Sequence, residues 1–296
     1  MDTVRLAGAL LHASWLMVPL VAWLLWRLRK PRLRGLAAAA LCLALVLVWA
    51  RFIEPRIIRV QETVLSGTGI DARIALVSDL HLGVYKDARF LSRLVDRLDA
   101  LEVDAIAIAG DFTFAPGHAS LDAMFAPLAR LDSPVYAVLG NHDQQAPGPD
   151  IDAALRAALA RHGVRIIEGQ IMDAGGYRWA GLGDRWAQRD DASFLRAAPA
   201  GTPTLVLAHN PDSATDLTPA DARLVLAGHT HGGQIRIPVL YRYVIPSAHG
   251  FDRGEASVVG RDGRPVRVFT TAGVGETGLP LRLFNPPTID LLELRP

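Results

Sequence analysis

The stretch Ile74-Ala-Leu-Val-Ser-Asp-Leu-His-Leu-Gly83 is an apolar run that ends in a carboxylate and an imidazole two residues apart. A short run of β-forming residues bounded by polar residues and Gly is typical of a buried strand. In open α/β sheets, ligand-binding groups lie just past the carboxyl ends of such strands. Because side chains alternate along an extended chain, Asp79 and His81 point to one side and can reach one cation. The structural alternative is a strand-end turn with a solvated His.

The same design, an apolar strand followed by polar residues, recurs four times further along the chain, at residues 104–111, 134–143, 204–210 and 223–231. Apolar residues at helical spacing predict helices over residues 87–101, 121–131 and 151–162. Further strands are expected over residues 57–65, 164–167, 177–182, 266–270 and 288–292. Strands that alternate with helices indicate βαβ units, so the sequence predicts an α/β fold with a substantial parallel component.

Polar residues of the types that bind metals collect at these strand ends: Asp79, His81, Asp111, Asn141, His142, His209, His229 and His231. Carboxylates, an amide oxygen and neutral imidazoles suit Mn, Fe or Zn, and the lack of thiolates argues against a structural zinc site. Even seven ligands from this set are too many for one ion. Two ions that share a bridging carboxylate, roughly 3.5–4 Å apart, would accommodate them and would clamp an in-line displacement at phosphorus.

Each of these residues also has a structural interpretation when it is taken alone. Asp111 can cap the following helix, Asn141 can occupy a turn, and His209 can be an ordinary strand-end residue. The occurrence of the whole set at successive strand ends favours a metal centre over these separate interpretations.

Five motifs occur in one order: Asp79-Leu-His81, Gly110-Asp111-Phe-Thr113, Gly140-Asn-His-Asp143, His209 and Gly228-His-Thr-His231. In this series the chain resembles the calcineurin-like metallophosphoesterase superfamily, over most of residues 70–234. The segments Ala208-His-Asn-Pro-Asp212, Gly228-His-Thr-His-Gly-Gly-Gln234 and Phe284-Asn-Pro-Pro287 resemble its bacterial membrane-associated YaeI/YkuE-like branch. The resemblance implies a four-layer α/β/β/α sandwich, in which two mixed sheets pack together, helices lie outside, and both metals sit at one rim.

The resemblance also implies a role for each motif residue. One divalent ion would be held by Asp79, His81 and His231, and the other by Asn141, His209 and His229. Asp111 would bridge the two ions, and a hydroxide shared by both would be the nucleophile. His142 would not bind metal but would face the phosphate, where it would stabilise charge or protonate the leaving group. Asp143 is expected to support the site, with a role in orienting His142 as one interpretation.

Two apolar segments precede this region. Residues 6–26 contain no charged side chain, and residues 36–50 are nearly all Leu, Ala and Val. The first is close to the roughly 20 residues that span a bilayer, and the second reaches that length over 36–53 if Arg51 snorkels. We therefore predict a transmembrane hairpin, with residues 1–56 as a membrane anchor and residues 57–296 as the metallophosphoesterase domain. Within the anchor, residues 51–56 are expected to form a short linker. A cleaved signal peptide is the alternative.

Charge patterning bears on the compartment and the partners. Residues 27–34 between the two apolar segments carry five positive charges and no acid. Positive loops stay in the cytoplasm, which predicts a multi-pass protein of the bacterial inner membrane with its catalytic domain on the extracytoplasmic side. Arg5, Arg51, Arg56 and Arg59 on the opposite flank nearly balance this count, so the orientation stays open. A net charge of +1 indicates no nucleic-acid partner, the basic flanks fit membrane lipids, and no protein partner is identifiable.

The predicted function is hydrolysis of a phosphodiester or pyrophosphate bond in a phosphate ester, which the anchor suggests is lipid-linked. The resemblance extends to a branch that hydrolyses UDP-diacylglucosamine, and a phospholipid is a further candidate. Residues 279–284 are an apolar run that would contact acyl chains or form loop core. Arg253 and Arg282 would contact a phosphate or form solvated salt bridges. The alternatives are a non-catalytic metal-dependent membrane scaffold and a broad-specificity phosphomonoesterase.

Overall fold

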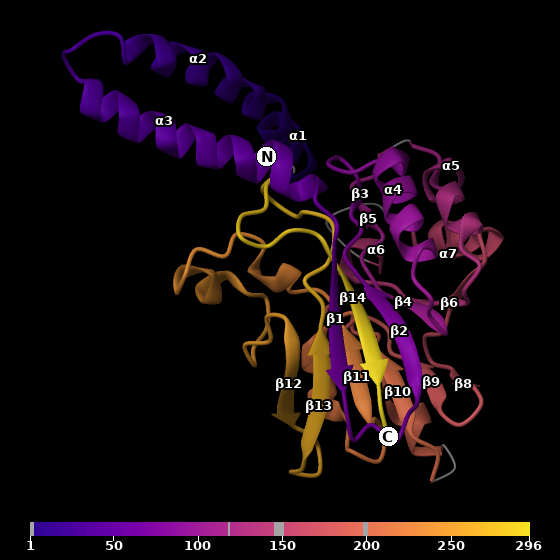
Figure 1. The fold of residues 1–296 in the computed structure, drawn as a ribbon. Coiled ribbons are helices and arrows are strands. Elements are labelled where there is room, and N and C mark those ends of the chain that lie inside the picture. Colours follow the sequence, from indigo (N-terminus) through magenta and orange to yellow (C-terminus); the bar gives the residue numbers. More distant parts are fainter. Residues whose placement is uncertain (1–2, 118, 145–150, 198–200) are drawn as a thin grey trace.

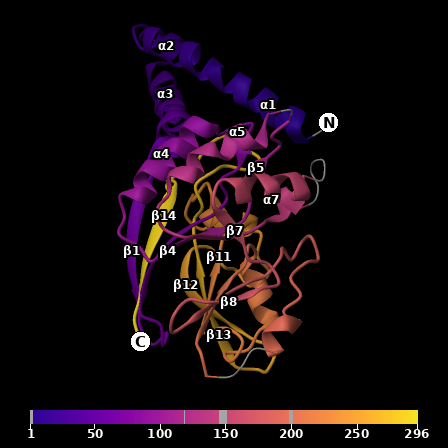
Figure 2. The ribbon, with the colours of Figure 1, turned by 90° about the vertical axis from the view of Figure 1, so that its right-hand side faces the viewer.

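A computed structural model describes residues 3–117, 119–144, 151–197 and 201–296, and it contains two six-stranded sheets packed face to face (Figure 1). A helical hairpin at the N-terminus projects away from one end of this sandwich. The view turned by 90° shows the same separation of hairpin and sandwich (Figure 2). The predicted α/β class, with two mixed sheets and an N-terminal hairpin, is confirmed.

The first sheet collects strands from both ends of the chain. Its order is β1 (Arg59–Leu65), β14 (Thr288–Leu294), β2 (Ala72–Val77), β4 (Ala105–Ala109), β6 (Val135–Val138) and β7 (Val164–Ile166). The strands β2, β4, β6 and β7 are parallel, as the βαβ pattern predicts, while β14 runs antiparallel to β2. The carboxyl ends of β2, β4 and β6 therefore meet at one edge.

The second sheet has the order β12 (Gly254–Val259), β13 (Pro265–Thr270), β11 (Leu224–Ala227), β10 (Thr204–Leu207), β9 (Arg178–Gly181) and β8 (Ile171–Asp173). The four central strands are parallel, and the two edge strands β8 and β12 are antiparallel to their neighbours. The sequence did not predict these edge strands, because β12 is largely exposed and lacks apolar alternation. A two-stranded ladder of β3 (Leu82–Gly83) and β5 (Thr113–Phe114) lies beyond the first sheet.

Alternation along the parallel strands divides the core into three layers. Ile74 and Leu76 of β2 face the second sheet, and Leu205 and Leu207 of β10 meet them in the central layer. The intervening residues of each strand face outward, with Ala75 and Val77 beneath the helices. Because central strands such as β2 and β10 are covered on both faces, their sequences are nearly continuous apolar runs.

Different outer layers cover the two sheets. The first sheet is covered by α4 (Ala88–Asp99), α5 (Leu121–Phe125), the 3₁₀ segment η4 (Ala126–Arg130) and α7 (Asp152–Arg161). Asp87 caps α4 by accepting a hydrogen bond from the Phe90 N–H. On the second sheet the outer layer contains the 3₁₀ segments η5 (Ser193–Ala197) and η6 (Pro211–Asp216). Both segments are short helical turns of five and six residues.

The N-terminal hairpin contains two nearly continuous helical stretches. The first consists of α1 (Thr3–Ala13), η1 (Ser14–Leu16) and α2 (Met17–Arg27), and the second of α3 (Arg34–Val48), the π-helical turn η2 (Trp49–Ile53) and η3 (Glu54–Arg56). Residues Arg5–Arg27 and Arg34–Arg56 are each long and apolar enough to cross a membrane, and most of their side chains are exposed. A bilayer would supply the missing apolar surroundings.

The C-terminal end of the second helical stretch is attached to the sandwich, whereas the sequence predicts a linker over residues 51–56. Ala50 O accepts a hydrogen bond from Arg282 N at 2.9 Å. Glu54 is buried and accepts from Asn285 N and from Trp49 Nε1. The segment is therefore part of the packed structure, because its carboxylate satisfies a loop amide far along the chain. The division of the chain at residue 56 stays a prediction.

Arg282 lies at the centre of this attachment and does not contact a phosphate or form a solvated salt bridge. Its side chain is 0% exposed, and its guanidinium donates to the carbonyl oxygens of Ala272, Gly275 and Asn285. A planar guanidinium with five N–H groups can donate hydrogen bonds to several backbone carbonyl oxygens at once. Both earlier interpretations of Arg282 are wrong, because its neighbours are buried carbonyls.

Replacing Arg282 by Met tests this role. The substitution leaves three buried carbonyls without donors, so we expect the free energy of unfolding to fall by about 3 kcal/mol. The measurement is the thermal midpoint of the solubilised full chain, beside that of Arg261→Met, whose more exposed guanidinium contacts Asp221. Equal thermal midpoints for the two variants would contradict the stabilising role of the Arg282 hydrogen bonds.

Candidate metal centre

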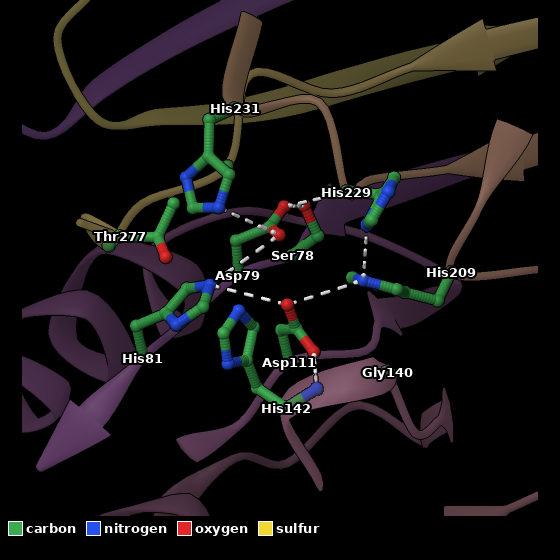
Figure 3. Close-up of polar contacts among 12 residues, drawn as sticks. Ser78, Asp79, His81, Asp111, Gly140, His142, His209, His229, His231 and Thr277 are labelled. Atoms are coloured by element: carbon green, nitrogen blue, oxygen red, sulfur yellow. Dashed lines mark hydrogen bonds and ion pairs between the residues drawn. The ribbon is translucent and has the colours of Figure 1, made fainter. Parts of the chain in front are cut away.

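Five strand-end segments place all eight predicted site residues at one rim of the sandwich. Figure 3 shows the carboxylates of Asp79 and Asp111 in the middle of a ring of imidazoles. Asp79 and His81 follow β2, Asp111 follows β4, and Asn141 and His142 begin the short helix α6 (Asn141–Gln144) after β6. His209 follows β10, while His229 and His231 follow β11, with His231 at the start of η7 (His231–Gly233). The two sheets therefore contribute opposite sides of one site.

The backbone is unusual at five of these residues. Asp79, His81, Asp111, His229 and His231 have φ angles between 48° and 68°, in the left-handed region that L-residues rarely adopt. Such conformations cost about 1–3 kcal/mol each and persist where the surrounding structure enforces them, often at functional sites. The strand ends therefore turn sharply, which brings successive polar side chains into the same space.

Two glycines allow the close approach of these turns. A Cβ atom on Gly110 would lie 2.6 Å from His209 Nδ1. A Cβ atom on Gly140 would overlap the carboxylate of Asp111. Any side chain at either position would displace a predicted ligand.

Asp79, His81 and His231 form the first group of candidate ligands. Their potential ligand atoms lie within 4.8 Å of one another. Asp79 Oδ1 is 3.3 Å from His231 Nε2 and 3.8 Å from His81 Nε2. Ser78 Oγ donates to the other oxygen of Asp79, which leaves Oδ1 directed at the two imidazoles.

His209, His229 and Asn141 form the second group. His209 Nδ1 contacts the carbonyl oxygen of Ala109 at 2.8 Å, which directs Nε2 into the site. His209 Nε2 lies 3.1 Å from His229 Nδ1 and 3.2 Å from Asn141 Oδ1. Two nitrogens and an amide oxygen thus converge from both sheets.

Asp111 connects the two groups. Its Oδ2 atom lies 3.3 Å from His81 Nε2 and also 3.3 Å from His209 Nε2. Separations of this size are expected between ligands of one ion that is bound at about 2.1 Å. The other oxygen accepts the N–H of His142 at 2.9 Å, which fixes the plane of the carboxylate. The carboxylate of Asp111 therefore lies between the two groups of candidate ligands and contacts both.

Several buried polar atoms of the site lack a hydrogen-bond partner among the described residues: Asp79 Oδ1, both ring nitrogens of His81, His229 Nε2 and His231 Nδ1. Buried polar groups are almost always satisfied, so a concentration of unsatisfied ligand atoms needs an explanation. Divalent cations would provide it, since oxygen and imidazole nitrogen together suit Mn, Fe or Zn. The residues present therefore fit metal binding, while the number and identity of the ions stay predictions.

The protonation states of the site are consistent with this interpretation. Although burial favours the neutral carboxyl, the surrounding histidines hold the pKa values of Asp79 and Asp111 below their usual range. Burial likewise favours a neutral ring at His81, but the carboxylates of Asp111 and Asp79 raise its pKa to about 9. Asp111 also raises the pKa of His209 against the effect of burial. Without metal, protons on these two rings therefore balance the two carboxylates.

His142 differs from the other histidines in its environment. It is half-buried at the mouth of the site, and its ring centroid lies 4.9 Å from that of His81 and 5.2 Å from that of Phe114. Burial lowers the pKa of His142 to about 4, so the ring is uncharged at neutral pH. One of its nitrogens lies within 4.8 Å of ligand atoms of His81 and Asp111. The geometry thus allows His142 to face either a metal or a substrate.

Asp143 supports the site differently from the expected contact with His142. Its carboxylate accepts the N–H groups of Phe112, Thr113 and Gly140, together with the Thr113 hydroxyl. It thereby joins the loops after β4 and β6, which carry Asp111 and Asn141. The only sequence signal for this role is that Asp143 directly follows Asn141-His142.

A cleft of about 470 Å³ opens above the candidate ligands. Asp111, Asn141, His142, His229 and His231 form its floor. Its wall is largely apolar and contains Trp186, Ile235, Val244, Pro246 and Leu279. Trp186, which the sequence analysis missed, contacts the ring of His229 edge-on at a centroid distance of 4.4 Å. No motif marks this Trp, because it lies in an irregular connection.

The cleft wall resolves the open interpretation of residues 279–284. Leu279 and Phe284 are exposed, whereas Leu283 is buried. Gln234 holds this loop by donating to the carbonyl oxygens of Thr277 and Leu279 and accepting the Thr277 N–H. Leu283 thus forms loop core, whereas Leu279 and Phe284 expose apolar surface.

The profile of the family described as calcineurin-like phosphoesterase matches residues 72–233, more than half of the chain. The chain belongs to this family of metal-dependent phosphoesterases, as its motifs predict.

Three relatives illustrate the similarity. The chain is 29% identical over 229 residues to the phosphodiesterase YaeI of Escherichia coli, and this alignment covers 75% of this chain and 82% of YaeI. It is 28% identical over 284 residues to the uncharacterized metallophosphoesterase YkuE of Bacillus subtilis, at coverages of 90% and 97%. A Bos taurus transmembrane protein with a metallophosphoesterase domain is 28% identical over 242 residues, at coverages of 75% and 53%.

Metal affinity should rise with pH in a defined window. Because the raised pKa values of His81 and His209 keep both rings protonated at neutral pH, a bound ion must displace these protons. We expect the affinity for Mn²⁺ to increase by about tenfold per pH unit for each displaced proton, up to about pH 9, where His81 becomes neutral. Calorimetry of the full chain in buffers of different ionisation enthalpy measures the protons released. Equal affinity from pH 6 to pH 8, without proton release, would contradict this assignment.

Proposed function

We propose that the protein is a membrane-anchored phosphoesterase with two divalent metal ions, which hydrolyses phosphodiester or pyrophosphate bonds in a lipid-linked substrate. Asp79, His81 and His231 would hold one ion, and Asn141, His209 and His229 the other. Asp111 would be shared between them.

The position of Asp111 is the observation that carries this proposal. A buried carboxylate oxygen lies 3.3 Å from imidazoles that belong to two different ligand groups. A single-ion site would have no use for a second set of ligands on the far side of this carboxylate. The strand β5 instead of a helix follows Asp111, so this almost completely buried carboxylate does not act as a helix cap.

Bound divalent ions would act as Lewis acids that neutralise phosphate charge and activate water for attack at phosphorus. The protein residues would position the ions and the substrate. The contacts of Ser78 with Asp79 and of Ala109 with His209 fix ligand orientation before substrate arrives. The apolar cleft wall would restrict water around the phosphate, which strengthens every electrostatic interaction there.

His142 would contact the phosphate of the substrate. Its uncharged ring offers one N–H donor that can stabilise a phosphoryl oxygen or the leaving oxygen. The negative charge of a bound phosphate would raise the pKa of this ring, so that proton donation to the leaving group becomes easier. His142 is thus suited to act on substrate rather than to serve as a permanent ligand.

The surroundings of the cleft support a lipid-linked substrate. The wall residues Trp186, Val244 and Leu279 present exposed apolar surface directly beside the ligand groups. The segment η8 (Leu240–Val244) continues this surface, with Leu240, Tyr243 and Val244 all more than half exposed. Acyl chains could cover these side chains while the phosphate enters the cleft. Because the anchor joins the sandwich directly, a lipid-linked substrate would be concentrated at the cleft.

The proposed location is a bacterial inner membrane, spanned twice by residues Arg5–Arg27 and Arg34–Arg56. The basic connection between the two helices supports a catalytic domain on the extracytoplasmic side. Attachment of the PhoA reporter after residue 296 tests this orientation, since the reporter is active only outside the cytoplasm.

Hydrolysis of bis-p-nitrophenyl phosphate and of p-nitrophenyl phosphate by the metal-stripped full chain, resupplied with Mn, Zn or Mg, tests the reaction. We expect metal-dependent cleavage that favours the diester. Asp111→Ala should reduce kcat on the order of 10³-fold or more, because both ligand groups lose a member. His249→Ala, at an exposed histidine outside the site, is the control. Stoichiometric metal binding without turnover of either ester would refute the reaction and support a metal-dependent scaffold.

His142→Ala separates the contact with substrate from metal binding. We expect kcat for the diester to fall by about 10²-fold or more through loss of a hydrogen-bond donor, while two ions per chain are retained. Metal content by elemental analysis and kcat are measured on the same samples. Loss of one equivalent of metal would instead identify His142 as a ligand.

A further inference from the structure

A second cavity, of about 590 Å³, lies where the anchor meets the catalytic domain. Five cationic side chains and two carboxylates line it: Arg51, Arg56, Lys86, Arg89 and Arg93, with Asp87 and Glu276. None of these residues belongs to the candidate metal centre. The cavity is therefore a separate, positively charged site.

Both carboxylates have other structural roles. Glu276 is buried and pairs with Lys86 at 3.1 Å. Asp87 accepts the N–H of Phe90 as the cap of α4. Arg56, Arg89 and Arg93 have no carboxylate within 4.0 Å among the residues that the structure describes. Three guanidinium groups thus line the cavity without forming an ion pair with any described carboxylate.

The uncompensated charge is held in a defined arrangement. Arg56 donates to the carbonyl oxygens of Phe52 and Arg51, which orients it along the end of the anchor. Arg89 and Arg93 are one turn apart on α4, and the guanidinium of Arg93 lies 5.6 Å from the ring of Phe90. Arginine binds phosphate through planar, bidentate hydrogen bonds, which makes such a group suited to an anionic phosphate.

The position of the cavity identifies the source of the phosphate. Arg51, Pro55 and Arg56 come from the last turns of the apolar stretch Arg34–Arg56, so this cavity lies where a membrane surface would be. Both ribbon views place α4 beside the lower end of α3 (Figures 1 and 2). Trp49 and Ile53, one turn further up, expose apolar surface to the expected acyl region. We propose that this cavity binds the phosphate headgroup of an anionic membrane lipid.

The cavity also adjoins the catalytic cleft through one loop. Glu276 and Pro280 line the basic cavity, whereas Thr277, Gly278 and Leu279 line the cleft. Tyr85, a lining residue of the cavity, donates its hydroxyl hydrogen to Gly278 O, and Gly275 N donates to Asp79 O. A bound headgroup therefore contacts one side of a loop whose other side borders the metal centre. This site is distinct from the substrate proposed above, and it does not depend on the reaction.

The test uses the delipidated full chain in detergent, with the variant Arg89→Gln/Arg93→Gln. Both arginines are exposed and lack a carboxylate partner among the described residues, so the fold should be retained. The matched control is Arg97→Gln/Arg165→Gln, which removes two exposed arginines outside the cavity. Native mass spectrometry measures binding of phosphatidylglycerol, phosphatidylcholine and inorganic phosphate.

We expect wild type and control to bind phosphatidylglycerol equally, and the cavity variant to bind it about 30-fold more weakly. Phosphatidylcholine should bind all three proteins alike. Equal binding of phosphatidylglycerol by variant and control would overturn the proposal. Binding of inorganic phosphate as tight as that of the lipid, and lost in the variant, would also overturn it, because the site would then serve a free anion. A thermal midpoint without lipid confirms that the variant is folded.

Discussion

The shared carboxylate of Asp111 is the interaction on which the arrangement of the site depends. It has to lie between imidazoles from two sheets, so the two sheets must pack with their parallel strand ends at one rim. The left-handed turns at the strand ends and the missing side chains of Gly110 and Gly140 follow from the same requirement. These features cost conformational energy, which the apolar layer between the sheets offsets.

Charge balance explains why so polar a site is stable inside the protein. Two carboxylates with no counter-charge would be prohibitively costly at this depth. Protons on His81 and His209 balance them when metal is absent, and cations would replace those protons when it binds. Metal binding and imidazole deprotonation are consequently one coupled equilibrium.

Much of this arrangement was predictable from the sequence, for a physical reason. The strands that carry site residues are buried on both faces, so they are short apolar runs with an abrupt polar end, as at residues 74–83. The edge strands β8 and β12 lack this contrast and were missed. The position of β14 was also not predictable, because nothing in residues 288–294 indicates that they pair between β1 and β2. Trp186 lies in an irregular segment, where position depends on tertiary packing.

Arg282 shows most clearly what a single sequence leaves open. Next to a candidate cleft, an arginine suggests a phosphate contact, yet here it is enclosed by backbone carbonyls that would otherwise be unsatisfied. The same residue connects to the N-terminal hairpin through its own N–H and Ala50 O. Loop 273–285 thus carries hydrogen bonds to the hairpin near one end and, through Gly275 N, to Asp79 near the other. Because Thr277, Gly278 and Leu279 of this loop also line the cleft, the packing of the hairpin and the shape of the cleft depend on the same short segment.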